Sequence, residues 1–207
     1  MSEKLFWITS PSAENDLIIG GKAKNLFKLN IMGVHVPKFG VVTSHAFDYW
    51  HKNKSLPTEL TQQLNHDVVE FGSQHFAVRS SMMLEDGENN SFAGIFDSFL
   101  FVKMEDIQLK IIECFESLYS DRAKSYFASK NITSNFSMSV VVQAMIAPDT
   151  SGVCFTRNPI GHSGLILIES LYGVGEHLVS GHGESDKYWV DRFGTIIKKE
   201  IKYKKDQ

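Results

Sequence analysis

The stretch "FAVRSSMMLEDGENNSFAGIFDSFLFV", residues 76–102, places two short apolar segments on either side of a long polar loop. Residues 76–79 and 98–102 are rich in aromatic and β-branched side chains, which favours two strands. The connection holds acidic residues, asparagines and glycines, a composition typical of a loop. This part of the chain therefore predicts a buried strand, a polar loop and a second apolar strand.

A single cation, Arg79, ends the first of these strands. Because a desolvated guanidinium needs a negatively charged partner, Arg79 favours one of two interpretations. It forms an internal ion pair with Glu85 or Asp86, or it binds an anion from outside the chain. Ser80 and Ser81 add hydroxyl donors beside it, which suggests a phosphate site.

Glycines at two places add to this pattern. Gly20, Gly21 and Lys22 precede a predicted helix, and a helix N-terminus beside an ammonium group favours anions. The segment lacks the first glycine and the hydroxyl residue of the GxxxxGK[ST] phosphate loop, so taken alone it is also consistent with an ordinary helix start. Gly94 allows the backbone to approach a ligand without a Cβ in the way.

Helical and strand patterns alternate irregularly along the chain. Helical spacing is found in residues 21–33, 44–54, 58–72 and 105–129, the last interrupted near residues 120–121, with a short helix within 171–181. Strand patterns occupy residues 5–8, 39–43, 138–146, 151–156, 164–170 and 187–192, and residues 198–207 suggest a basic, solvated strand end or tail. This mixture predicts an α+β fold, and no linker marks a domain boundary.

The composition is that of an ordinary globular protein. With 207 residues the chain is long enough for one substantial core or two small lobes, and its net charge of -3 provides no basic field for nucleic acid. Cys114 and Cys154 lie in apolar surroundings without a CxxC spacing, which favours reduced core thiols. No signal pattern or long apolar run is evident, so we expect a cytoplasmic protein with neither a membrane nor a nucleic-acid partner.

Four stretches, in register, resemble the nucleotide-binding domain of the phosphoenolpyruvate synthase, pyruvate phosphate dikinase and rifampicin phosphotransferase family. They are "GGKAKNLFKLNIMGVHVPKFGVVTSHAF" (20–47), "FAVRSSMMLEDGENNSFAGIFDSFL" (76–100), "MSVVVQAMIAPDTSGVCFTRNP" (138–159) and "LILIESLYGVGEHLVSG" (165–181). The resemblance extends from Gly20 to Asp191, which is most of the chain.

The resemblance implies an ATP-grasp-like domain whose two α+β lobes hold ATP, with Mg²⁺, between them. In this family a phosphoryl group passes from ATP to a histidine on a separate swivelling domain. That domain carries it to pyruvate, an antibiotic or another small acceptor. The cations and backbone donors described above suit this reaction. Phosphoryl transfer depends on positioning and charge neutralisation more than on covalent chemistry.

Residue by residue, the family motifs assign roles to eight positions of this sequence. Lys22 and Arg79 would contact the phosphates, and the loop from Gly94 to Ser98 would close over them. The positions beside the adenine or ribose would be Gln143, Met145 and Ile146, and an acidic position near the nucleotide would be Glu176.

The sequence departs from the family where the domain normally ends. Family members have a segment of the type Gln-Asp-Ile-Glu-Trp followed by Gln-x-Arg, whose carboxylate and amide hold magnesium and whose arginine assists transfer. Residues 1–207 contain no such segment, no phosphohistidine domain and no acceptor domain, and the span 43–79 is short for the family. The resemblance therefore implies a truncated ATP-binding domain, without assigned catalytic or metal-ligating residues, that should not complete the family reaction alone.

Three functions remain open at this point. In the first, the chain is an ATP-binding component of a split or truncated phosphotransferase whose histidine lies on another domain or chain. In the second, it is a degenerate, non-catalytic nucleotide-binding module. The third possibility is an interaction module that retains only the fold. Lys22, Arg79, Gly94 and Gln143 favour the first two, because a scaffold has no physical need for this combination.

Overall fold

The computed structural model describes residues 5–83, 92, 94–133, 136–159, 164–179 and 184–202. It divides the chain into two compact units, Met1–Met145 and Ile146–Gln207. Both units combine helices with antiparallel strands, which confirms the α+β class. No linker composition marks the division between them. Within the described ranges, no helix has the length and hydrophobicity that crossing a membrane requires.

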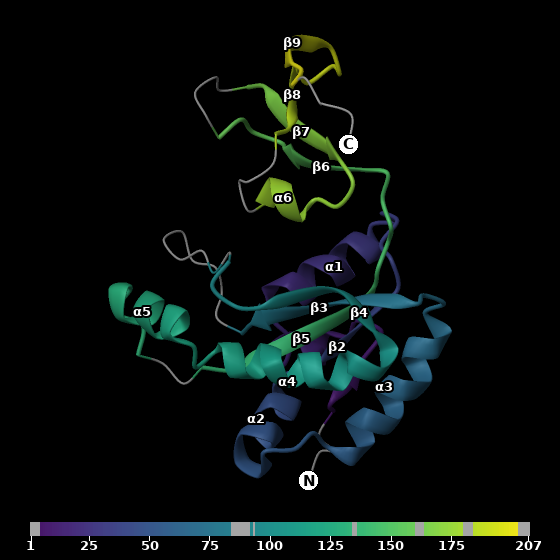
Figure 1. The fold of residues 1–207 in the computed structure, drawn as a ribbon, viewed down its shortest axis with the longest axis vertical. Helices are drawn as coiled ribbons and strands as arrows, with labels where there is room; N and C mark the ends of the chain where they lie inside the picture. Colours follow the sequence, from purple (N-terminus) through teal and green to yellow (C-terminus); the bar gives the residue numbers. More distant parts are fainter. Residues whose placement is uncertain are drawn as a thin grey trace. The chain divides into compact units, whose positions relative to one another are not determined.

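The first unit is a five-stranded sheet with helices on both faces. Its elements are β1 (Trp7–Ile8), the 3-10 helix η1 (Ala13–Leu17), α1 (Gly21–Ile31), β2 (Phe39–Val42), α2 (Ser44–Asn53), α3 (Thr58–Glu70), β3 (His75–Met82), β4 (Ser98–Lys103), the 3-10 helix η2 (Met104–Asp106), α4 (Ile107–Ser117), α5 (Asp121–Ser129) and β5 (Met138–Ala144). The strand order is β1-β2-β5-β3-β4, and every neighbouring pair is antiparallel. Figure 1 shows α1 on one face of this sheet and α2 and α4 on the other.

Strand β5 contributes to a hydrophobic core on each face of the sheet. Successive side chains of a strand point to opposite faces. Val140 and Val142 accordingly belong to the larger core, which includes residues of α2, α3 and α4. Val141 belongs to a smaller core with Ala23 and Phe27 of α1. A strand covered on both faces explains why Val140, Val141 and Val142 are consecutive apolar residues instead of alternating with polar ones.

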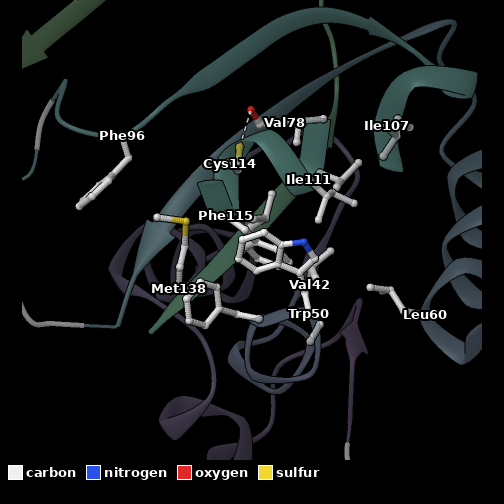
Figure 2. Close-up of a cluster of buried hydrophobic side chains, with 14 of the residues drawn as sticks. Val42, Trp50, Leu60, Val78, Phe96, Ile107, Ile111, Cys114, Phe115 and Met138 are labelled. Carbon is white, nitrogen blue, oxygen red and sulfur yellow. Dashed lines mark hydrogen bonds between the residues drawn. The ribbon is translucent and has the colours of Figure 1, made fainter. Parts of the chain in front are cut away.

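The larger core contains a buried thiol. Figure 2 shows Cys114 of α4 beside Phe115 and Trp50, with its Sγ directed at the carbonyl oxygen of Val78, 3.9 Å away. The rings of Trp50 and Phe115 lie 5.4 Å apart between centroids. Burial raises the pKa of the Cys114 thiol to about 12, and the negative charge of Asp97 adds to this rise. Cys114 is therefore the free core thiol that its sequence neighbours predict.

Helix boundaries follow the local signals in the sequence. Gly33, with φ of 77°, lies two residues beyond the end of α1, at the predicted stop. The predicted interruption in residues 105–129 separates α4 from α5, and Ser120 caps α5 by accepting a hydrogen bond from the N–H of Ala123 at 3.2 Å. Helix η1 was not predicted.

The second unit is a four-stranded antiparallel meander. Its elements are β6 (Thr150–Phe155), β7 (Ile166–Tyr172), α6 (Glu176–Val179), β8 (Asp186–Val190) and β9 (Ile196–Glu200). The strands lie in the order β6-β7-β8-β9. Among its described residues, the buried hydrophobic side chains are those of Leu167, Leu171 and Val190.

The expectation that Cys154 is a core thiol is wrong, because its side chain is exposed. Strand β6 forms an edge of the sheet, and four of its six residues are exposed. Apolar sequence neighbours therefore did not imply burial at this position.

Residues Ile196–Glu200 form a further strand, β9. The sequence predicted only a basic strand end or tail at residues 198–207. Asp191 Oδ1 accepts hydrogen bonds from the N–H groups of Phe193, at 2.9 Å, and Thr195, at 2.8 Å. Gly194, with φ of 89°, completes the turn between β8 and β9. This turn brings the exposed, lysine-containing β9 back against β8.

We expect a thiol reagent at about pH 8 to modify Cys154 rapidly and Cys114 only after unfolding, because reaction requires an accessible thiolate. The pKa of about 12 leaves Cys114 protonated at that pH, and the core shields it. In Cys154→Ser, the native protein should show no fast-reacting thiol and the denatured protein should show one. Rapid labelling of native Cys154→Ser would contradict the buried position of Cys114.

Candidate functional site

The start of α1 lies against the backbone of β3. A Cβ on Gly20 would overlap the backbone of Ser81 and the carbonyl oxygen of Met82. At the neighbouring Gly21, a Cβ would meet nothing within 4 Å. Only a glycine therefore fits at residue 20 without moving α1 away from the sheet.

Two serines join α1 to the strands beneath it. The N–H of Gly20 donates a hydrogen bond to Ser139 Oγ at 2.9 Å, and this hydroxyl donates to the carbonyl oxygen of Ser81 at 3.0 Å. The N–H of Ala23 donates to Ser81 Oγ at 3.4 Å. Ser81 and Ser139 are almost fully buried, so these bonds stabilise the first turn of α1 in a position protected from water.

Lys22 extends from this turn to β3. Its Nζ donates a hydrogen bond of 2.7 Å to the carbonyl oxygen of Ser80, the residue that follows Arg79. The positive charge of Lys22 also opposes the rise in the pKa of Cys114, the thiol packed beneath β3. The contact therefore holds an ammonium group at the helix N-terminus, where the helix dipole adds partial positive charge.

Arg79 lies on the same face of the sheet as α1. It pairs with Val141 of β5 and with Ser98 of β4, and directly opposed residues of antiparallel strands share a face. Since Val141 packs with the α1 side chains, Arg79 and Ser98 share the face that α1 covers. Gln143 is two residues beyond Val141 in β5 and lies on this face as well.

Burial disfavours the charged form of the Arg79 guanidinium. Desolvation lowers the pKa of Arg79 below its ordinary value, although an arginine remains protonated in a protein. No carboxylate among the described residues forms an ion pair with it. Glu85 and Asp86, the internal partners that the sequence suggests, lie outside the described residues. In the described part of the chain, Arg79 is a partly buried cation that would gain from an anion.

Ser80 does not contribute to this face, which corrects the expectation that Ser80 and Ser81 both add hydroxyl donors for a ligand. Alternation directs the Ser80 side chain to the opposite face, where it is 1% exposed. Its Oγ has no hydrogen-bond partner among the described residues. The Ser81 hydroxyl lies on the α1 face but accepts the bond from α1.

The other predicted residues of the first unit lie at the ends of its strands. Gly94 is exposed with φ of 72°, in the turn before β4, and the exposed Ser98 begins β4. Gln143 Nε2 donates to the carbonyl oxygen of Pro37 at 3.3 Å. Met145 follows β5, and its N–H donates to the carbonyl oxygen of His75 at 2.9 Å.

The structure therefore brings Lys22, Arg79, Ser98 and Gln143 onto one face of the first unit. Ile146 and Glu176 belong to the second unit, where both side chains are exposed and Glu176 begins α6. No group of three histidine, cysteine or acidic residues in the described ranges could hold a metal ion. Sequence reasoning missed Ser139, which does not stand out until β5 is placed beneath α1.

Comparison with known proteins identifies a family for most of the chain. Residues 50–207 match the family described as "Pyruvate phosphate dikinase, AMP/ATP-binding domain". Arg79, Gly94, Ser98, Gln143 and Glu176 lie within this match, and Lys22 precedes it.

Individual relatives cover the N-terminal part as well. A prodigiosin synthesizing transferase of Serratia marcescens is 31% identical over 90% of this chain and 24% of its own length. A rifampicin phosphotransferase of Bacillus cereus is 34% identical over 91% of this chain and 26% of its own length. A probable phosphoenolpyruvate synthase of Staphylothermus marinus is 28% identical over 92% of this chain and 28% of its own length. The chain thus spans about a quarter of the length of these relatives.

We expect Gly20→Ala to lower the free energy of unfolding by about 1–3 kcal/mol, because its Cβ forces α1 away from β3. Gly21→Ala is the matched control, since its Cβ meets open space and alanine favours the helix by up to about 1 kcal/mol. Urea unfolding midpoints of both variants test the difference. Equal midpoints for Gly20→Ala and the wild type would contradict the close approach.

Proposed function

Since this chain belongs to the pyruvate phosphate dikinase AMP/ATP-binding domain family, we propose that it is the ATP-binding component of a phosphotransferase related to phosphoenolpyruvate synthase and pyruvate phosphate dikinase. In this proposal a phosphoryl group passes from ATP to a histidine on another domain or chain. The residues of this chain bind the nucleotide and orient it for that transfer.

The observation that carries the proposal is that two cations lie at neighbouring residues of β3, Arg79 as part of the strand and Lys22 by its contact with Ser80. Lys22 Nζ is bound to the carbonyl oxygen of Ser80, and Arg79 precedes Ser80 on the face that α1 covers. A triphosphate presents several negative charges close together, so neighbouring fixed cations neutralise it without rearranging at the moment of transfer. The N-terminus of α1 adds backbone dipoles at the same place.

The remaining residues of the first unit have roles in this proposal that their positions support. Gly94 and Ser98 bound the turn that enters β4 opposite Arg79, so backbone and hydroxyl donors there would bind phosphate oxygens. The nucleoside would lie beside Gln143, Met145 and Ile146, at the end of β5. For Glu176, which begins α6 of the second unit, the proposed role near the nucleotide rests on the family motif alone.

Mg²⁺ would accompany ATP as a complex with its phosphates. Among the described residues, no three histidine, cysteine or acidic side chains lie together in a way that could hold a metal ion. Mg²⁺ commonly binds substrate phosphates with only one or two carboxylates from the protein. We therefore assign no step to magnesium held by this chain.

The phosphoryl acceptor is proposed to lie outside residues 1–207. The relatives are about four times as long as the part that this chain matches, which leaves most of their length for further domains. Two free thiols support a cytoplasmic setting for this function. A non-catalytic nucleotide-binding module is the alternative.

Calorimetric titration with ATP and Mg²⁺ tests the proposal. We expect saturable binding by the wild type and a loss of about tenfold or more in Lys22→Ala and in Arg79→Ala, because each removes a charge-assisted contact to phosphate. Lys28→Ala is the matched control, because Lys28 is exposed in the last turn of the same helix.

Thermal unfolding establishes that each variant is folded at the titration temperature. A folded wild type that binds no ATP would refute the proposed function. Wild-type affinity in folded Arg79→Ala would instead support the internal ion pair and remove Arg79 from the site.

A further inference from the structure

Arg122, the second residue of α5, contacts the turn before β4 at two points. Its Nε donates a hydrogen bond of 2.8 Å to the carbonyl oxygen of Ile95. One terminal nitrogen of the same guanidinium donates to Asp97 Oδ1 at 2.7 Å. The rigid fork of an arginine can hold two acceptors at fixed positions in this way, whereas a lysine ammonium acts as a point charge.

The turn is also held from the side of α4 and β3. The N–H of Asp97 donates to Ser117 Oγ at 3.3 Å, and the Ser117 hydroxyl donates to the carbonyl oxygen of Cys114 at 2.7 Å. The carbonyl oxygen of Asp97 accepts from the N–H of Ser80 at 3.4 Å and faces Cys114 Sγ at 3.7 Å. Residues 95–97 are therefore fixed by α4, α5 and β3 together.

This fixed segment lies between two residues of the proposed nucleotide site. Gly94 immediately precedes it, and Ser98 immediately follows it and pairs with Arg79. A displacement of residues 95–97 would therefore move Gly94, Ser98 or both relative to Arg79.

We propose that Arg122 is a positioning residue for nucleotide binding. It holds the turn at residues 95–97 so that Gly94 and Ser98 remain beside Arg79 when the phosphates bind. The guanidinium acts through the turn, since both of its observed contacts are to the turn. This inference rests on the proposed function and adds a residue that the sequence analysis did not select.

A purely stabilising role is a poor explanation for this arrangement. The Arg122 side chain is 53% exposed and that of Asp97 is 44% exposed, and ion pairs in such surroundings contribute little to stability. The same helix carries an ordinary exposed pair, Lys124 with Asp121 at 3.7 Å. The Arg122 contacts differ from that pair because they join α5 to a distant turn at two points.

The test combines ATP titration with amide hydrogen exchange on the purified chain. In Arg122→Ala we expect ATP affinity to fall about tenfold and exchange of residues 94–98 to accelerate, with the protein still folded. Arg122→Lys should lose most of the same affinity, because it keeps the charge but not the fork. Lys124→Ala is the matched control and should bind ATP like the wild type.

Asp97→Asn weakens the contact between Arg122 and Asp97 from the side of Asp97. It replaces Arg122→Ala in the test if Arg122→Ala does not fold. The inference would be overturned, and the proposed function left intact, if Arg122→Ala or Arg122→Lys bound ATP with wild-type affinity. Unchanged hydrogen exchange of residues 94–98 in a folded Arg122→Ala would have the same meaning. A folded wild type that binds no ATP would overturn the proposed function, and the nucleotide role of Arg122 with it.

Discussion

Gly20 lies so close to β3 that a Cβ on it would overlap the backbone of Ser81. This approach allows the buried hydroxyl of Ser139 to connect the N–H of Gly20 with β3. It also sets the start of α1 where Lys22 reaches the carbonyl oxygen of Ser80. A helix displaced by a larger residue would lose these hydrogen bonds and move the ammonium away from Arg79. The position of the cationic site therefore depends on a backbone contact that only glycine permits.

The two cations differ in how the surrounding structure controls them. Lys22 is exposed, and a hydrogen bond to the backbone orients its ammonium group. Arg79 is partly buried, and desolvation lowers its pKa. Desolvation weakens competition from water for a bound anion, so a phosphate at Arg79 would interact more strongly than one at an exposed arginine. The turn that Arg122 holds would then place further donors opposite Arg79, on the same face.

Local patterns predicted most of the elements, but not the contacts that assemble the site. Apolar spacing and the stop at Gly33 predicted α1, and a short apolar run ending in Arg79 predicted the first part of β3. Alternation along β3 could have separated Ser80 from Arg79, but the sequence did not indicate which face α1 covers. The pairing of β5 with β3 joins segments about sixty residues apart, and this pairing places Ser139 beneath α1. The two contacts of the Arg122 guanidinium likewise depend on how α5 lies against the turn at residues 95–97, which is distant from it in sequence.

The most direct test of this account is a crystal structure of the chain with Mg²⁺ and a non-hydrolysable ATP analogue. The account predicts phosphate oxygens within hydrogen-bonding distance of Lys22 Nζ and of the Arg79 guanidinium, at the start of α1. A bound nucleotide whose phosphates contact neither cation would contradict it. So would an Arg79 that keeps an internal carboxylate partner while the nucleotide is bound.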